Sequence, residues 1–128
     1  MMRADIFVPT VSVDEQVRFY VKELRLFVVS QNYGMGEILL RHIDCPSFCL
    51  QLQPNRSPSG DWPIFCMTTE DCRSEFARLS VVAFQKGGLV PDAGAGAQSY
   101  EYPLGQTISL RDASGNLFLI TEWHPSAL

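Results

Sequence analysis

Imidazole is scarce in this sequence, because only His42 and His124 occur among its 128 residues. Hydrolytic triads and most zinc or iron sites depend on histidine, so the scarcity argues against both. Basic side chains are also in the minority: 10 Lys and Arg against 14 Asp and Glu give a formal net charge of −4. No basic stripe interrupts that balance, and because nucleic-acid binding requires several phosphates to be neutralised at once, no nucleic-acid partner is expected.

Long apolar segments are lacking as well. Leu26–Val29 and Leu117–Ile120 are among the longest apolar runs, far short of the roughly 20 residues that cross a bilayer. The N-terminus shows no basic start followed by an apolar stretch. Neither a secretory signal nor a membrane partner is therefore expected.

The cysteines match neither the paired C-x2-C spacing of zinc knuckles nor a C-x-x-C redox motif. Their even number permits disulfide pairing, but no other feature of the sequence indicates an oxidising compartment. Reduced thiols and a cytoplasmic location are therefore expected. The four residues are Cys45, Cys49, Cys66 and Cys72.

What the sequence does contain is an ordinary globular mixture, with 46% hydrophobic and 19% charged residues. This composition excludes disorder, a collagen-like repeat and a coiled coil as the main architecture. The length predicts a single domain over residues 1–128. A domain of this size buries about two thirds of its unfolded surface, which is enough for a hydrophobic core.

The first half of the chain predicts a strand, a helix and three further strands. Alternating side chains predict the first strand over 3–11. Ser12 and Glu15 then form a predicted capping box, at which an amphipathic helix begins that reaches about Leu24. Apolar-rich segments separated by turns predict the other strands at 26–30, 36–42 and 47–53.

The same order returns in the second half, after a polar and proline-rich connector at 54–61. Here Asp71 begins the predicted helix and Gly87-Gly88 closes it. Because Ser12 and Asp71 lie about half a chain length apart, the pattern predicts a duplicated βαβββ unit. The predicted strands lie at 62–69, 100–103, 106–111 and 117–123. Module one thus spans about 3–53 and module two about 62–123, with a tail at 124–128.

Two segments carry a resemblance to a known family. Val11–Leu24 contains Phe19-Tyr20, a short spacer and Leu24, and Leu110–Glu122 contains Asp112-Ala113-Ser114-Gly115-Asn116 before its strand. Together they resemble the vicinal oxygen chelate superfamily of glyoxalases, extradiol dioxygenases and bleomycin-resistance proteins, most closely the metal-free bleomycin-resistance type. The resemblance implies an α+β fold in which two βαβββ modules form a curved mixed sheet around an open cleft.

In the metal-using members of this superfamily, four side chains of the cleft, usually His and Glu, hold one divalent ion. The resemblance places those positions at Asp5, Gln51, Ile64 and Leu119. Two of the four are hydrocarbon, and glutamine is a poor ligand for zinc or ferrous iron. We therefore expect neither a metal nor another cofactor.

Without a metal, the cleft is expected to be an apolar pocket with a few polar groups, which suits a small organic molecule. Tyrosines would provide flat surfaces for an aromatic ligand, and a carboxylate would hold a cationic group. Residues 92–98 are a candidate flap over the cleft. The predicted ligand-binding residues are Asp5, Phe7, Cys49, Gln51, Ile64, Cys66, Tyr100, Tyr102 and Leu119.

The leading hypothesis is a metal-free, homodimeric protein that sequesters or recognises a small organic ligand, with an antibiotic as one candidate. One alternative is a metal-dependent lyase, isomerase or dioxygenase of the same superfamily. Another is a non-catalytic interaction module whose cleft is filled by its own side chains. The sequence identifies no catalytic residue, and it leaves open whether the two modules face each other within one chain or pair with a second chain.

Overall fold

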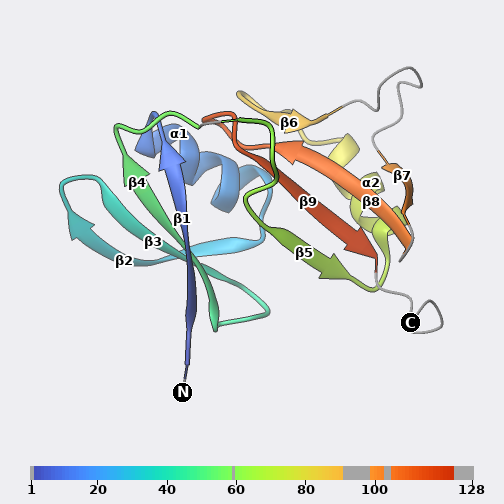
Figure 1. Ribbon diagram of the computed structural model, residues 1–128, viewed down its shortest axis with the longest axis horizontal. Coiled ribbons are helices and arrows are strands. Elements are labelled where there is room, and N and C mark those ends of the chain that lie inside the picture. Colours follow the sequence, from blue (N-terminus) through green and yellow to red (C-terminus); the bar gives the residue numbers. More distant parts are fainter. Residues whose placement is uncertain (1, 59, 91–98, 103–104, 123–128) are drawn as a thin grey trace.

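The computed structural model describes residues 2–58, 60–90, 99–102 and 105–122 and contains two β-sheets (Figure 1). The first sheet consists of β1 (Ala4–Thr10), β2 (Phe27–Gly34), β3 (Glu37–His42) and β4 (Phe48–Pro54). Its strand order is β1-β4-β3-β2, in which β1 is parallel to β4 and the other neighbours are antiparallel.

The helical connection between β1 and β2 begins where the sequence predicts. The Oγ of Ser12 accepts a hydrogen bond from the Glu15 amide at 3.4 Å. From there α1 (Val13–Val17) continues into a π-helical segment, η1 (Arg18–Glu23). The Glu15 carboxylate pairs with the Nζ of Lys86 at 3.0 Å rather than completing the capping box. Neither this stretch nor any other helix in the described part of the chain has the length and hydropathy of a membrane span.

The second sheet consists of β5 (Cys66–Thr69), β6 (Gly88–Leu89), β7 (Ser99–Tyr102), β8 (Gly105–Arg111) and β9 (Leu117–Glu122). Helix α2 (Cys72–Ser80) follows β5. β5 is parallel to β9, which is antiparallel to β8, and β6 and β7 pair one after the other along the far edge of β8. Since β6 and β7 together take the place of one strand, the second half repeats the first, and the predicted α+β fold with two βαβββ modules is confirmed.

Two predicted elements of module two differ from the structure. The strand predicted at 62–69 begins only at Cys66. Backbone hydrogen bonds to Leu117 and Leu119 already involve Ile64 and Phe65, and Pro63 before them has no amide hydrogen with which to extend the ladder. Gly87-Gly88, predicted to close the helix, instead leads into β6, and α2 ends at Ser80. Gly87 has a φ of +77°, and a Cβ there would lie 2.4 Å from the Arg111 carbonyl oxygen, so only glycine permits this approach to β8. The candidate flap at 92–98 lies outside the described residues.

One hydrophobic core joins the two modules. The fully buried ring of Phe118 on β9 stacks on Phe65 with 4.9 Å between centroids. The Phe118 ring also packs edge-on against Phe19 of η1, with 6.0 Å between ring centroids. Phe65 in turn contacts Phe48 of β4, with 5.6 Å between centroids. Both sheets thus turn one face towards this shared core. The opposite face of each sheet, which we call its outer face, points away from the core.

A buried carboxylate also fastens the first helix to the β8–β9 turn. The Asp112 Oδ2 accepts hydrogen bonds from the Tyr20 hydroxyl at 2.7 Å and from the Gln16 Nε2 at 3.0 Å. Its Oδ1 accepts from the amides of Ser114 and Asn116, both at 3.0 Å. Asp112 is fully buried, so these donors are what compensates the loss of water around it. The turn that carries part of the family resemblance therefore holds the modules together.

Candidate ligand-binding site

Four of the predicted ligand-binding residues lie together on the outer face of the first sheet. In the register of β1 and β4, Asp5 lies beside Cys49 and Phe7 beside Gln51. Phe7 is 64% exposed, whereas Cys49 is only 1% exposed and is covered by its neighbours on this face. The face therefore combines an exposed aromatic ring with an amide and a carboxylate. Their part in ligand binding stays a prediction.

Arg3 holds the Asp5 carboxylate in a two-point ion pair. The Arg3 Nε lies 2.8 Å from Oδ1 and the Nη2 lies 2.9 Å from Oδ2. The hydrogen bond and the charge of Asp5 raise the pKa of Arg3. Because the Arg3 side chain is 47% exposed, solvent screens this pair and it adds little to stability. A cationic ligand would compete with Arg3 for the same carboxylate.

The outer face of the second sheet carries Cys66 and Leu119, which are direct neighbours on β5 and β9. The Cys66 Sγ lies 3.2 Å from the Thr121 Oγ1. Ile64 lies before β5 and packs against the shared core. This face therefore presents a thiol and a hydroxyl next to the hydrocarbon of Leu119.

The two predicted tyrosines lie on β7 at the edge of the second sheet. Tyr100 pairs with Thr107 and Tyr102 pairs with Gly105 across β8. The directions of their side chains lie outside the described part of the structure. Their role as stacking surfaces stays a prediction.

The residues at the four positions that the family resemblance assigns to metal ligands do not fit a metal centre. Asp5 is engaged by Arg3, while Ile64 and Leu119 have no lone pairs to donate. The Gln51 amide is a weak ligand for transition metals such as zinc or ferrous iron. Across the described ranges, no group of three or more His, Cys, Asp or Glu could hold a metal ion.

Burial separates the four cysteines into two classes. Cys45 and Cys66 are exposed, whereas Cys49 and Cys72 are buried. Burial, reinforced by the charge of Glu122, raises the pKa of the Cys72 thiol to about 11. Burial also raises the pKa of Cys49. Both buried thiols are therefore protonated at neutral pH and are poor nucleophiles.

A thiol-reactive dye at neutral pH is expected to label Cys45 and Cys66 quickly and the other two cysteines only after unfolding, because reaction requires an accessible thiolate. Peptide mass spectrometry at increasing labelling times measures this order. The variant Cys66→Ser should lose one fast site and keep the other. Fast labelling of Cys72 in the folded protein would contradict its burial.

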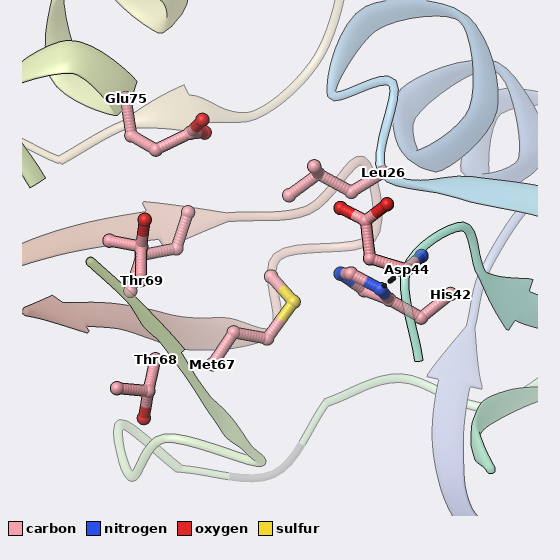
Figure 2. Close-up of a pocket in the computed structure, with 8 residues that line it drawn as sticks. Leu26, His42, Asp44, Met67, Thr68, Thr69 and Glu75 are labelled. Carbon is pink, nitrogen blue, oxygen red and sulfur yellow. Dashed lines mark hydrogen bonds between the residues drawn. The ribbon is translucent and has the colours of Figure 1, made fainter. Parts of the chain in front are cut away.

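A further pocket, which the sequence did not predict, lies where β3 and the β3–β4 turn meet β5 (Figure 2). We call it the junction pocket. Its volume is about 120 Å³, and an adjacent hollow of about 210 Å³ shares His42 and Met67 with it. Leu26 adds apolar wall, and Asp44 and Glu75 add carboxylates. The only hint of this pocket in the sequence is that a histidine and an aspartate, His42 and Asp44, lie one residue apart just after a predicted strand.

His42 presents a hydrogen-bond donor to the junction pocket. Its Nδ1 accepts a hydrogen bond from the Asp44 amide at 3.1 Å. Burial lowers the pKa of His42, an effect that the nearby Asp44 charge opposes. The ring is therefore neutral near pH 7, and since Nδ1 uses its lone pair as an acceptor, the proton lies on Nε2. In Figure 2 this second ring nitrogen points towards the middle of the pocket, on the side of Met67.

Comparison with known proteins identifies the fold. No protein-family profile and no curated protein sequence matches this chain. Among solved structures, TnmS3, an antibiotic binding protein from Streptomyces sp. CB03234, is 17% identical over 97% of both chains, with a TM-score of 0.71. A glyoxalase/bleomycin resistance protein/dioxygenase superfamily member from Sphaerobacter thermophilus is 15% identical over 95% of this chain and 97% of that chain, with a TM-score of 0.69.

The bleomycin-binding protein of Streptomyces verticillus, solved with copper(II)-bleomycin, gives a TM-score of 0.66 at 17% identity, over 97% of this chain and 98% of that chain. At these identities the likeness concerns the fold. The chain therefore has the fold of the glyoxalase/bleomycin resistance protein/dioxygenase superfamily, which confirms the fold that the resemblance to the vicinal oxygen chelate proteins implied.

Proposed function

We propose that this protein binds and sequesters a small organic molecule, without a metal and without catalysing a reaction. Two proteins of the same fold are described as an antibiotic binding protein and a bleomycin-binding protein. Stacking and hydrogen bonding to an organic guest require no cation, and this chain has hydrocarbon at two of the four positions that the family resemblance assigns to metal ligands. An antibiotic is therefore one candidate guest, and the cytoplasm is the compartment we assign to the protein.

The observation that supports the proposal is the composition of the first sheet's outer face. Phe7 exposes 64% of its surface beside the polar Gln51 and Asp5. An exposed aromatic ring offers a stacking surface, and the polar groups beside it can orient a ligand through hydrogen bonds. A planar guest would stack on Phe7 and hydrogen-bond to Gln51, and a cationic group on it would replace Arg3 at Asp5.

The second part of the proposal is a homodimer. Because the sheets share their core, the two outer faces of one chain point away from it. A cleft enclosed by two sheets then arises when the outer face of the first sheet in one copy packs against the outer face of the second sheet in another copy. The partner copy would contribute Cys66 and Leu119 to the guest's surroundings. Such a symmetric pairing gives two equivalent clefts per dimer.

A thermal-shift screen with planar and cationic organic molecules, bleomycin among them, tests the proposal. A guest present at 100 times its Kd is expected to stabilise the protein by about 2.7 kcal/mol, a rise in Tm on the order of 10 °C. The substitutions Phe7→Ala and Gln51→Ala should each weaken binding about tenfold, since each removes one direct contact worth about 1.4 kcal/mol.

The matched control is Val81→Ala, because Val81 is 84% exposed at the C-terminal end of α2 and belongs to neither sheet. It should leave both the Tm and the affinity unchanged. Analytical ultracentrifugation should show a dimer that Phe7→Glu dissociates. A monomer with no response across the panel would contradict the proposal and would favour an interaction module.

A further inference from the structure

The junction pocket is lined by His42 and Asp44, two side chains of complementary hydrogen-bonding character. The His42 Nε2–H is a donor directed into the pocket, as Figure 2 shows. The carboxylate of Asp44, two residues along the same turn, is an acceptor at the same wall. A ligand that offers an acceptor next to a donor would satisfy both groups at once.

Charge distinguishes the two ends of the pocket. Glu75, at the opposite end in Figure 2, is neutralised by Arg78, whose Nη2 lies 2.7 Å from its Oε2. Among the ion pairs formed by the described residues, none involves Asp44. Since His42 is neutral, the wall formed by His42 and Asp44 has a net negative charge. A polar ligand group should therefore turn its hydrogen-bond donor towards Asp44.

The size and the remaining walls favour one flat ring. Leu26, Met67 and Ile120 supply hydrocarbon and a thioether around a volume of about 120 Å³. An apolar cavity of roughly 150 Å³ holds a benzene molecule, so this pocket and its adjacent hollow suit a single ring. Methionine sulfur also makes favourable contacts with aromatic rings.

A metal ion does not fit the same groups. Coordination through Nε2 requires a lone pair there, and the hydrogen bond accepted at Nδ1 places the proton on Nε2 instead. The adjacent hollow adds Cys45 and Cys66, but these thiols and His42 do not form a three-ligand group within the described chain. The pocket is therefore suited to an organic ligand.

We propose that the junction pocket binds a single-ring nitrogen heterocycle that carries an amino group next to a ring nitrogen. The ring nitrogen accepts a hydrogen bond from the His42 Nε2–H, and the amino group donates one to Asp44. The ring packs against Met67 and Leu26. His42 and Asp44, which recognise this ligand, differ from Phe7 and Gln51 of the proposed guest site, although the adjacent hollow reaches Cys66.

The probe is 2-aminopyrimidine, a neutral ring of this class, titrated into the intact protein while the side-chain nitrogens of His42 are followed by NMR. Saturable shifts of the His42 signals are expected with a Kd on the order of 1 mM, as befits a ligand of this size. Pyrimidine lacks the donor and aniline lacks the ring acceptor. Each analogue should bind about tenfold more weakly, because it loses one of the two hydrogen bonds.

Two substitutions of His42 separate hydrogen bonding from shape. His42→Phe keeps a ring in place but removes the donor, and it should weaken binding about tenfold. His42→Gln restores an N–H and should recover most of the affinity. The matched control is Val81→Ala, because Val81 is 84% exposed at the end of α2 and lines neither proposed site, and it should leave the 2-aminopyrimidine titration unchanged.

Two results would overturn the proposal. One is the absence of saturable His42 shifts up to about 20 mM probe, well above the expected Kd. The other is equal binding of aniline, pyrimidine and 2-aminopyrimidine, which would mean a nonspecific hydrophobic contact. Because these titrations use the unmodified protein, they decide the question even if a His42 variant fails to fold.

Discussion

Replacing Asp112 with asparagine is expected to lower the free energy of unfolding by about 3 kcal/mol, a fall in Tm on the order of 10 °C. The carboxylate oxygens of Asp112 accept hydrogen bonds from Tyr20, Gln16, Ser114 and Asn116. An amide nitrogen in place of either oxygen would turn hydrogen atoms towards groups that are themselves donors. Chemical denaturation followed by circular dichroism measures the loss.

The matched control is Asp61→Asn, because the Asp61 side chain is 90% exposed and meets Arg111 at 3.2 Å. An exposed pair of this kind should change stability by less than about 0.5 kcal/mol. Equal effects of the two substitutions would mean that the Asp112 network does not hold the modules together.

The pH dependence of stability gives a second readout for Asp112. Burial raises the pKa of this carboxyl above its ordinary value, against the opposing effect of its hydrogen bonds. The folded state therefore retains a proton at pH values where the unfolded state has released it. Stability of the unmodified protein should then fall as pH rises between the unfolded and the folded pKa, since the folded state binds more protons there. Asp112→Asn should lack this slope.

Truncation of Phe118 to alanine is expected to cost about 4 kcal/mol, because it opens a cavity in the core that both modules share. The Phe118 ring stacks on Phe65, and its centroid lies 5.9 Å from that of Tyr20 and 6.0 Å from that of Phe19. One unfolding transition, shifted as a whole, is the expected behaviour, with tyrosine and tryptophan signals changing together.

Trp62→Ala removes an aromatic ring of similar size from a position that is 85% exposed, and it should alter stability by less than about 0.5 kcal/mol. If Phe118→Ala instead produced two separate transitions, with module one unaffected, the modules would be independent units. The account of a shared core would then be wrong.

The sequence predicted most of the fold because local signals and the hydrophobic pattern agree along much of the chain. Ser12 and Asp71 cap helices that begin at Val13 and Cys72, and the alternation along β1 and β4 matches the buried and exposed faces. The pattern failed near Pro63, which has no amide hydrogen to donate to a ladder, and near Gly87. At Gly87 the outcome depends on the approach of β8, because a Cβ there would lie 2.4 Å from the Arg111 carbonyl oxygen, and no local sequence signal indicates this approach.

The candidate site was predictable only in part. Alternation within a strand determines that Asp5 and Phe7 share a face, and the parallel register brings Cys49 and Gln51 beside them. The ion pair between Arg3 and Asp5 depends on side-chain rotamers, which a strand pattern does not fix. The junction pocket depends on how the two modules pack, so His42 in module one and Met67 in module two could not be paired from their positions in the sequence.

The measurement that tests the central claim most directly is the thermal-shift screen run on chelator-treated protein, with and without added zinc, iron, manganese or nickel. The account predicts that at least one planar or cationic organic molecule raises the Tm by the same amount in every condition, and that Phe7→Ala reduces the rise. Elemental analysis showing one transition-metal ion per chain, together with stabilisation only when that metal is present, would contradict it.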